Sequence, residues 1–395
     1  MTLIKIIFWV AVFIIFYTYL GYGILLYMLV KIKEIFIKPI KFELPEEELM
    51  PDVTIFITAY NEEKVIDEKM RNCLALNYPA NKLHIAWVTD GSNDHSNELL
   101  QTKWKDKATV LFQPERQGKA AAMIRGIKLI KTPIVVFTDA NAMINSDAVR
   151  HIILAFQDSH VGCVAGEKRV ISQTKDGAAA GGEGLYWKYE SFLKKFDARL
   201  YSVVGAAGEL FAVRRDLFPE VRPDTLIDDF VISLRIAMNN HTTAYCTDAY
   251  TIERGSADMC EEQKRKVRIT AGGLQAIWRL RPLLNPFRYG TLSFQYVSHR
   301  VLRWSVTPFF LFALLPLNII ILFMSSSPVY ITIFVLQCLF YLLGLWGYYL
   351  SSKKIRNKLL YIPYYFLFMN VNVFKGIGYL SKKKKNAVWE KVKRA

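Results

Sequence analysis

The sequence predicts an α/β fold with a mostly parallel, layered sheet, flanked at both ends by apolar helices. Two observations lead to this prediction. Short β-branched and aromatic runs alternate with helical stretches between residues 51 and 280, as in sheets whose strands are joined by crossover helices. Unbroken apolar stretches before and after this region are long enough to cross a bilayer. We therefore expect a globular domain held at a membrane.

The composition supports the same class of protein. The 395-residue chain is 52% hydrophobic and yet carries a formal net charge of +16, which suits a membrane protein with a basic cytoplasmic face. A nucleic-acid-binding protein would need basic residues along a groove or a base-reading motif, and the sequence shows neither. The five cysteines form no CxxC pair, which argues against a zinc site or a disulfide framework and suits a reducing compartment.

Residues 1–50 are predicted to form an N-terminal transmembrane anchor and a linker. The stretch from Leu3 to Val30 is almost continuously apolar and long enough to span a bilayer. It lacks the short core and small-residue cleavage site of a signal peptide. A single lysine, Lys5, lies at its N-terminal end, and several follow it, namely Lys31, Lys33, Lys38 and Lys41. The positive-inside rule therefore places the domain of residues 51–280 in the cytoplasm.

The strands of this domain are predicted to end at polar motifs. Four candidates follow one another: Val53–Ile57, His84–Val88, Thr109–Phe112 and the central stretch Ile134–Asn141. In open α/β sheets, ligands bind outside the carboxyl ends of the strands. Asp139 and Asn141 are two residues apart and so share one side of an extended chain, where both could face a cation or a diphosphate. A turn cap is the alternative role for Asp139. Residues 139–253 look less regular, with mixed helices and glycine-rich turns.

The C-terminal part is predicted to return to the membrane. Residues 281–304 interleave aromatic and basic side chains, which is typical of an amphipathic helix in the membrane interface. Within residues 305–395, Val306–Met324 and Val329–Leu350 are candidate spans. We expect Leu359–Leu380 to be interfacial or re-entrant, because a full crossing would place the cluster Lys382–Lys385 outside, against the charge rule.

Six motifs occur in a fixed order: Ala59–Glu63, Thr89–Asp94, Gly118-Lys119, Asp139-Ala140-Asn141, Thr225–Phe230 and Glu262–Ile269. Together they resemble the family-2 glycosyltransferases, and among these the membrane-embedded synthases of cellulose, hyaluronan and poly-N-acetylglucosamine. The resemblance covers Pro51 to about Arg303 and the flanking spans. It implies a Rossmann-like, GT-A type domain of the nucleotide-diphospho-sugar transferases.

The resemblance also assigns a binding site for the nucleotide sugar. It would consist of Ala59, Tyr60, Glu62, Asp90, Gly118, Lys119, Asp139, Arg265 and Arg268. Thr89 replaces the first acid of the family motif, so Asp90 must act in its place. Lys119 and free backbone N–H groups at a helix start would meet the diphosphate, although a solvated lysine is the usual explanation of a lone Gly-Lys pair.

The resemblance implies a Mg²⁺ or Mn²⁺ ion held by Asp139 and Asn141, which bridges to the diphosphate. Since Asn141 stands where the family has an acid, one negative charge is missing. We therefore expect this difference to affect the affinity for the metal more than the position of the metal.

In the resemblance, Asp229 is the general base on the acceptor hydroxyl. Gly205, Gly208, Glu209 and Asp228 would face the acceptor, while helix capping is the alternative for the paired acids. The family's Gln-x-x-Arg-Trp motif is altered, because Gln263 is followed by Lys266 and Val267. Arg265 and Arg268 keep the cationic function, and loss of the tryptophan weakens the inference of processive synthesis.

We therefore expect a multi-pass membrane enzyme of polysaccharide biosynthesis: an inverting, metal-dependent hexosyl- or N-acetylhexosaminyltransferase with a cytoplasmic catalytic domain. It would transfer a sugar from a nucleotide sugar, most simply a UDP-sugar, onto a growing β-linked glycan. The expected partners are the donor, a glycan or lipid-linked acceptor, membrane lipids, and export or synthase subunits. Two alternatives stay open: transfer of one sugar to a lipid acceptor such as a polyprenyl phosphate, and a non-catalytic membrane subunit of a synthase complex.

Overall fold

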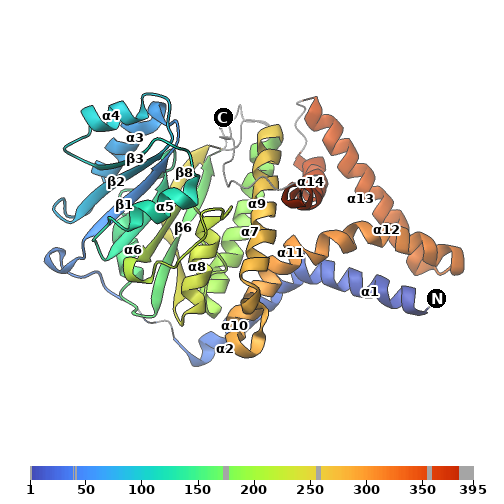
Figure 1. Cartoon of the computed structure of the whole chain (residues 1–395). Coiled ribbons are helices and arrows are strands. Elements are labelled where there is room, and N and C mark those ends of the chain that lie inside the picture. Colours follow the sequence, from blue (N-terminus) through green and yellow to red (C-terminus); the bar gives the residue numbers. More distant parts are fainter. Residues whose placement is uncertain are drawn as a thin grey trace.

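The computed structural model describes residues 2–38, 40, 42–171, 178–254, 259–353 and 358–381. Figure 1 shows a domain of sheet and helices on one side, from which long helices project on the other. Lys41 and the cluster Lys382–Lys385, on which part of the predicted topology rests, lie outside the described residues.

The domain is built on an eight-stranded sheet of order β3-β2-β1-β4-β7-β6-β8-β5 among the described residues. Its parallel half contains the four predicted strands, here β1 (Val53–Ala59), β2 (Leu83–Asp90), β3 (Thr109–Gln113) and β4 (Ile134–Asp139). The register pairs Ala59 with Thr89 and Thr58 with Asp139. The ends of β1, β2 and β4 are therefore level at one edge, as the sequence predicted for the polar motifs.

The other half of the sheet was not predicted. It consists of β5 (Met143–Ile144), β6 (Val161–Ile171), β7 (Leu210–Arg214) and β8 (Thr242–Arg254), with β7 antiparallel to both β4 and β6. The expectation of a less regular region at 139–253 was wrong. The reason is a buried ion pair, in which Lys168 Nζ on β6 lies 2.6 Å from Glu253 Oε2 on β8. Such charges break the apolar run by which a buried strand is recognised.

Helices cover both faces of the sheet (Figure 1). One face carries α3 (Glu63–Leu74), α4 (Ser96–Thr102) and α6 (Ala148–Ala155), and the other carries α5 (Lys119–Ile127), α8 (Asp228–Met238) and the end of α9 (Met259–Arg279). On β1, Ile55 and Ile57 pack into the first layer and Phe56 into the second. Because successive side chains of a strand alternate in direction, a strand covered on both faces is apolar throughout.

The N-terminal helix does more than anchor the chain. Helix α1 (Thr2–Phe16), the π turn η1 (Tyr17–Gly21) and α2 (Tyr22–Phe36) form one helical stretch of 35 residues, about 52 Å long at 1.5 Å per residue. A bilayer core is only about 30 Å thick. The excess length packs on α7 (Ala178–Leu200), where Leu26 meets Leu193 and Arg199 donates two hydrogen bonds to the Glu34 carboxylate.

Three helices of the described chain are long and apolar enough to cross a membrane: Thr2–Phe36, α12 (Val306–Met324) and α13 (Pro328–Ser352). All three match predicted spans. The last apolar run forms α14 (Lys358–Ser381), which packs along α9 and α13 and is not one of the three candidates. Its predicted re-entrant or interfacial placement stays a prediction.

Residues 281–304 form several short helical elements rather than one amphipathic helix with a single lipid-facing side. They are η4 (Arg281–Leu284), α10 (Pro286–Tyr296), η5 (Val297–Val301) and α11 (Leu302–Trp304). Phe287 is fully exposed, but Tyr296 and Trp304 lie in the domain core, and Arg300 and Arg303 pair with Glu190 of α7. The second half of the segment therefore faces the protein interior, where both arginines share Glu190, and only the first half is exposed to meet an interface.

Candidate active site

A single cavity of about 960 Å³ joins the edge of the sheet to the membrane helices. At one end lie the carboxyl ends of β1, β2 and β4, and at the other α1, η1 and α14. The cavity is lined by every residue to which the sequence assigned a role, with one exception, Gly205. Gly205 has φ +88°, and a Cβ there would lie 2.0 Å from the Phe230 ring. Gly205 thus belongs to a turn packed on α8, and its assignment to the acceptor stays a prediction without support from the cavity lining.

Asp90 shapes the loop that opens α5. Its carboxylate accepts hydrogen bonds from the backbone N–H groups of Gln117, at 3.0 Å, and Gly118, at 2.7 Å. Gly91 has φ +70°, and a Cβ there would lie 2.6 Å from the Arg116 nitrogen. The absence of a side chain at Gly91 therefore allows the backbone of Arg116 to approach closely. The N–H of Gly118 was expected to bind the diphosphate, but it already donates its hydrogen bond to Asp90.

The sequence analysis missed Arg116. Its guanidinium carbon lies 3.5 Å from the centre of the Tyr60 ring, and both residues line the cavity next to Glu62. A flat aromatic surface backed by a guanidinium is a suitable wall for a nucleobase or ribose. The only sequence signal for it is a basic residue just before the Gly118-Lys119 pair.

Lys119 and three carboxylates form the charged centre of the cavity. Lys119 Nζ donates to Asp139 Oδ1 at 2.6 Å. Burial would lower the pKa of Lys119, but Asp139, Asp228 and Asp229 together raise it above its ordinary value. Burial, with the neighbouring Asp228, raises the pKa of Asp229 to about 7, against the opposing effect of Lys119.

Gly208 keeps this centre open. A Cβ at Gly208 would lie 3.2 Å from Lys119 Nζ and 3.3 Å from Asp229 Oδ2. Beside it, Asp228 Oδ2 is buried and has no hydrogen-bond partner among the described residues. The two acids are the first residues of α8, and Ile227 is its N-cap. A pair of carboxylates held next to a lysine, one of them with a pKa near neutrality, is suited to proton transfer.

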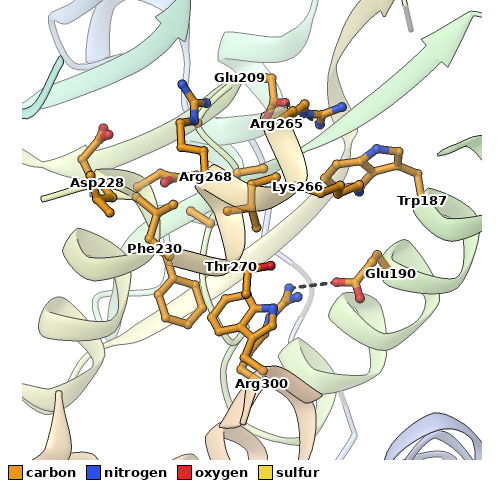
Figure 2. Close-up of a pocket in the computed structure, with 18 of the residues that line it drawn as sticks. Trp187, Glu190, Glu209, Asp228, Phe230, Arg265, Lys266, Arg268, Thr270 and Arg300 are labelled. Carbon is orange, nitrogen blue, oxygen red and sulfur yellow. Dashed lines mark ion pairs between the residues drawn. The ribbon is translucent and has the colours of Figure 1, made fainter. Parts of the chain in front are cut away.

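Helix α9 supplies the cations predicted for the diphosphate, but the two arginines differ. Arg265 is buried between two carboxylates, 3.6 Å from Glu262 Oε2 and 3.8 Å from Glu209 Oε1. Arg268 Nε is buried without a hydrogen-bond partner in the described part of the chain. Figure 2 shows both arginines on α9, near Glu209. Arg268 is therefore the arginine placed to receive an anion.

The residues present fit a divalent cation that the diphosphate helps to hold. Among the described residues no group of three His, Cys, Asp or Glu side chains could hold a metal. Asp139 and Asn141 both line the cavity, and Mg²⁺ is often bound by one or two protein oxygens together with substrate phosphates and water. The carboxylate of Asp139 already accepts from Lys119, so a metal would share or replace that contact.

The fold is of the GT-A type that glycosyltransferases adopt. The structure superposes on a mannosyltransferase from Pyrobaculum calidifontis, solved in complex with GDP-mannose and Mn²⁺, with a TM-score of 0.73. The match covers 96% of this chain and 100% of the other, at 20% sequence identity. At this identity the likeness concerns the fold.

Residues 54–222, less than half of the chain, match the family model described as glycosyl transferase family 2. The chain is 25% identical over 212 residues to the beta-monoglucosyldiacylglycerol synthase of Trichormus variabilis, covering 52% of this chain and 45% of the relative. It is 34% identical over 121 residues to the poly-beta-1,6-N-acetyl-D-glucosamine synthase of Staphylococcus aureus, covering 30% and 29%. The chain thus spans less than half the length of either relative.

Proposed function

We propose that the protein is a membrane-bound, inverting glycosyltransferase that moves a sugar from a UDP-sugar to a hydroxyl of an acceptor at the membrane. The observation that carries this proposal is Asp229. Its carboxylate lines the cavity beside Gly208, and its pKa is raised to about 7 by burial and by Asp228. A carboxylate with such a pKa can take a proton from a hydroxyl near neutral pH.

The donor would occupy the sheet end of the cavity. Tyr60 and Arg116 would receive the nucleoside, and Lys119 and Arg268 would balance the charge of the diphosphate. A metal ion held by Asp139 and Asn141 would add a Lewis acid on the diphosphate. UDP is proposed on the resemblance to UDP-sugar-dependent synthases, and the relative solved with GDP-mannose makes GDP-sugars the first alternative.

The reaction is a single displacement. The acceptor oxygen forms a bond to the anomeric carbon while the bond from that carbon to the diphosphate oxygen breaks. The acceptor proton passes to Asp229, and the nucleoside diphosphate leaves against Lys119 and Arg268. Attack from the face opposite the leaving group inverts the anomeric configuration, and it needs one base. Asp228, whose Oδ2 has no partner among the described residues, would orient the acceptor.

The acceptor would enter from the membrane end, between η1 and α14. A growing glycan and a single lipid both suit this route, and relatives are named for each product type. The non-catalytic alternative is disfavoured, since the acids and cations needed for transfer line one cavity.

The test is nucleotide release by the purified protein in a sugar-free detergent. We would supply UDP-glucose, UDP-N-acetylglucosamine and GDP-mannose in turn, each with Mg²⁺ or Mn²⁺ and membrane lipid extract. Release from a UDP-sugar, with a β-linked product from its α-linked donor, is the expected result. Release from no donor would contradict the proposed enzyme, and release from GDP-mannose alone would contradict the proposed nucleotide.

A further inference from the structure

The membrane end of the cavity contains a buried cation that the transfer reaction does not use. Lys194 on α7 is only 4% exposed and lines the cavity. Its ammonium makes no hydrogen bond or ion pair with the described residues, and the centre of the Trp187 ring is 5.9 Å away. Burying an ammonium without a counter-ion is costly. Such a group is expected where an anion binds.

The surroundings of Lys194 are also positive. Arg300 Nη2 lies 2.8 Å from Glu190 Oε2 (Figure 2), and the same carboxylate pairs with Arg303. His299 Nε2 is 3.4 Å from it. One glutamate thus pairs with two arginines, so this group of three carries a net positive charge, and Lys194 adds another. Burial and nearby Arg300 lower the pKa of Lys194, against the opposing effect of Glu190, Glu209 and Asp229, none of which forms an ion pair with it.

Beyond these cations the cavity wall becomes apolar. It is formed by Phe16 and Leu20 on one side and by Ile362 and Phe366 of α14 on the other. Tyr19 joins the two sides by donating a hydrogen bond to Asn370 Oδ1 at 2.7 Å. The first side belongs to the N-terminal candidate span. The apolar end therefore lies where lipid chains would surround the protein, and the buried cations lie inward of it.

We propose that the acceptor is a membrane lipid that carries a phosphate and a free hydroxyl. The phosphate binds Lys194 and Arg300, the acyl or prenyl chains leave between η1 and α14, and the hydroxyl faces Asp229. This inference rests on the proposed function and names its acceptor class.

A hydroxyl, rather than the phosphate, is the nucleophile because the cavity provides a base. A phosphate monoester is ionised near neutral pH and can attack without losing a proton to the protein. A hydroxyl is a poor nucleophile until a positioned group removes its proton. Lys194 and Asp229 line the same cavity, so a headgroup bound at Lys194 would present its hydroxyl on the side of the base. In the transfer, the lipid oxygen bonds to the anomeric carbon, its proton moves to Asp229, and the nucleoside diphosphate departs.

The experiment compares four probes with the full-length protein, delipidated in a sugar-free detergent. Phosphatidylglycerol has chains, phosphate and hydroxyls, diacylglycerol lacks the phosphate, undecaprenyl phosphate lacks the hydroxyl, and glycerol 1-phosphate lacks the chains. Two readouts are taken: stimulation of nucleotide release from the donor, and the shift in thermal unfolding temperature on adding each probe. We expect both effects to be largest with phosphatidylglycerol.

Three variants of α7 make the test specific. In Lys194→Met the concentration of phosphatidylglycerol for half-maximal effect should rise about tenfold or more, the loss expected for a charge-assisted contact, and Lys194→Arg should restore most of it. Lys195→Met removes the same charge from an exposed position of the same helix and should leave the value unchanged. Equal values in the Lys194→Met and Lys195→Met variants would overturn the proposal.

The four probes test separately the phosphate, the chains and the hydroxyl of the proposed acceptor. If diacylglycerol acts as well as phosphatidylglycerol, the phosphate site is wrong, and if glycerol 1-phosphate does, the lipid is wrong. Transfer of the sugar to undecaprenyl phosphate would contradict the claim that a hydroxyl is the nucleophile. If no donor releases nucleotide, the proposed function fails, while the thermal shift with phosphatidylglycerol and its loss in Lys194→Met still decide the lipid site.

Discussion

Lys119 Nζ lies 2.6 Å from Asp139 Oδ1, so the cation assigned to the diphosphate and the carboxylate assigned to the metal are partners of each other. Each screens the other's charge while the donor is absent. When the donor binds, the diphosphate would supply a negative charge for Lys119 and the metal a positive charge for Asp139. Each residue would exchange one charged partner for another, so that neither charge is left buried without a partner. The arrangement links donor binding to the acidic centre at Asp228 and Asp229.

Replacing this lysine should change the pH dependence as well as the rate. Lys119 opposes the rise in the pKa of Asp229, so in Lys119→Met the pKa of Asp229 should rise further. The acidic limb of the pH–rate profile would then move to higher pH, and donor affinity would fall because a cation at the diphosphate is lost. The measurement is turnover against pH at saturating donor. A limb at unchanged pH would show that Lys119 does not act on the base.

The metal can be tested at two neighbouring positions. Asp139→Ala should abolish turnover. Asn141→Asp adds a negative charge and should keep or improve activity at low concentrations of Mg²⁺ or Mn²⁺. Turnover in a metal titration, with and without EDTA, measures both. Wild-type activity that EDTA does not diminish would be incompatible with a metal held at Asp139 and Asn141.

Gly205 is predicted to matter for folding. Alanine at φ +88° is strained, and its Cβ would meet the Phe230 ring at 2.0 Å. Gly205→Ala should destabilise the fold by about 1–3 kcal/mol and reduce turnover, because Phe230 follows Asp229. Gly378→Ala is the matched control, since a Cβ at Gly378 has no neighbour within 4 Å. Thermal unfolding compares them, and equal unfolding temperatures would disprove the role given to Gly205.

The three candidate spans predict a membrane topology that can be tested. With the catalytic domain in the cytoplasm, the turn between α12 and α13 lies outside and the end of α13 inside. In a background without the five native cysteines, a cysteine at Ser326 should react with an impermeant thiol reagent added to intact cells. One at Lys353 should react only after permeabilisation. The reverse pattern would place the catalytic domain outside.

The parallel half of the sheet could be predicted because its strands are buried on both faces. Residues such as Ile55 and Phe56 pack into opposite layers, so the strand reads as an unbroken apolar run. Polar residues at its end then locate the ligand edge. Strands β6 and β8 could not be recognised in this way, because Lys168 and Glu253 are buried as a pair and look like surface residues in the sequence.

The same limitation explains what was missed in the site. Lys194 and Arg300 occur in helices with ordinary amphipathic patterns, and only the packing of α7 against η5 shows that they face inward. Gly205 was assigned to the acceptor together with Gly208 and Glu209, as one stretch of a glycine-rich turn. Sequence spacing cannot show that the neighbour requiring a glycine there is Phe230.

The raised pKa of Asp229 predicts opposite effects of pH on activity and stability. As a base Asp229 must be ionised, so turnover should fall as the pH drops below about 7. A carboxyl whose pKa is raised in the folded state stabilises the fold below its unfolded pKa, and this contribution is lost as the pH rises through the folded pKa. Asp229→Asn should therefore unfold at a higher temperature than the wild type at about pH 8, and the difference should shrink toward about pH 5.

The most direct test of the proposed chemistry is nucleotide release by Asp229→Asn, with UDP binding followed by calorimetry in the same preparation. The account predicts a loss in turnover of about 10²–10⁴ with UDP affinity nearly unchanged. Asp228→Asn should lose less. Turnover near the wild-type rate in Asp229→Asn would contradict the assignment of this carboxylate as the base.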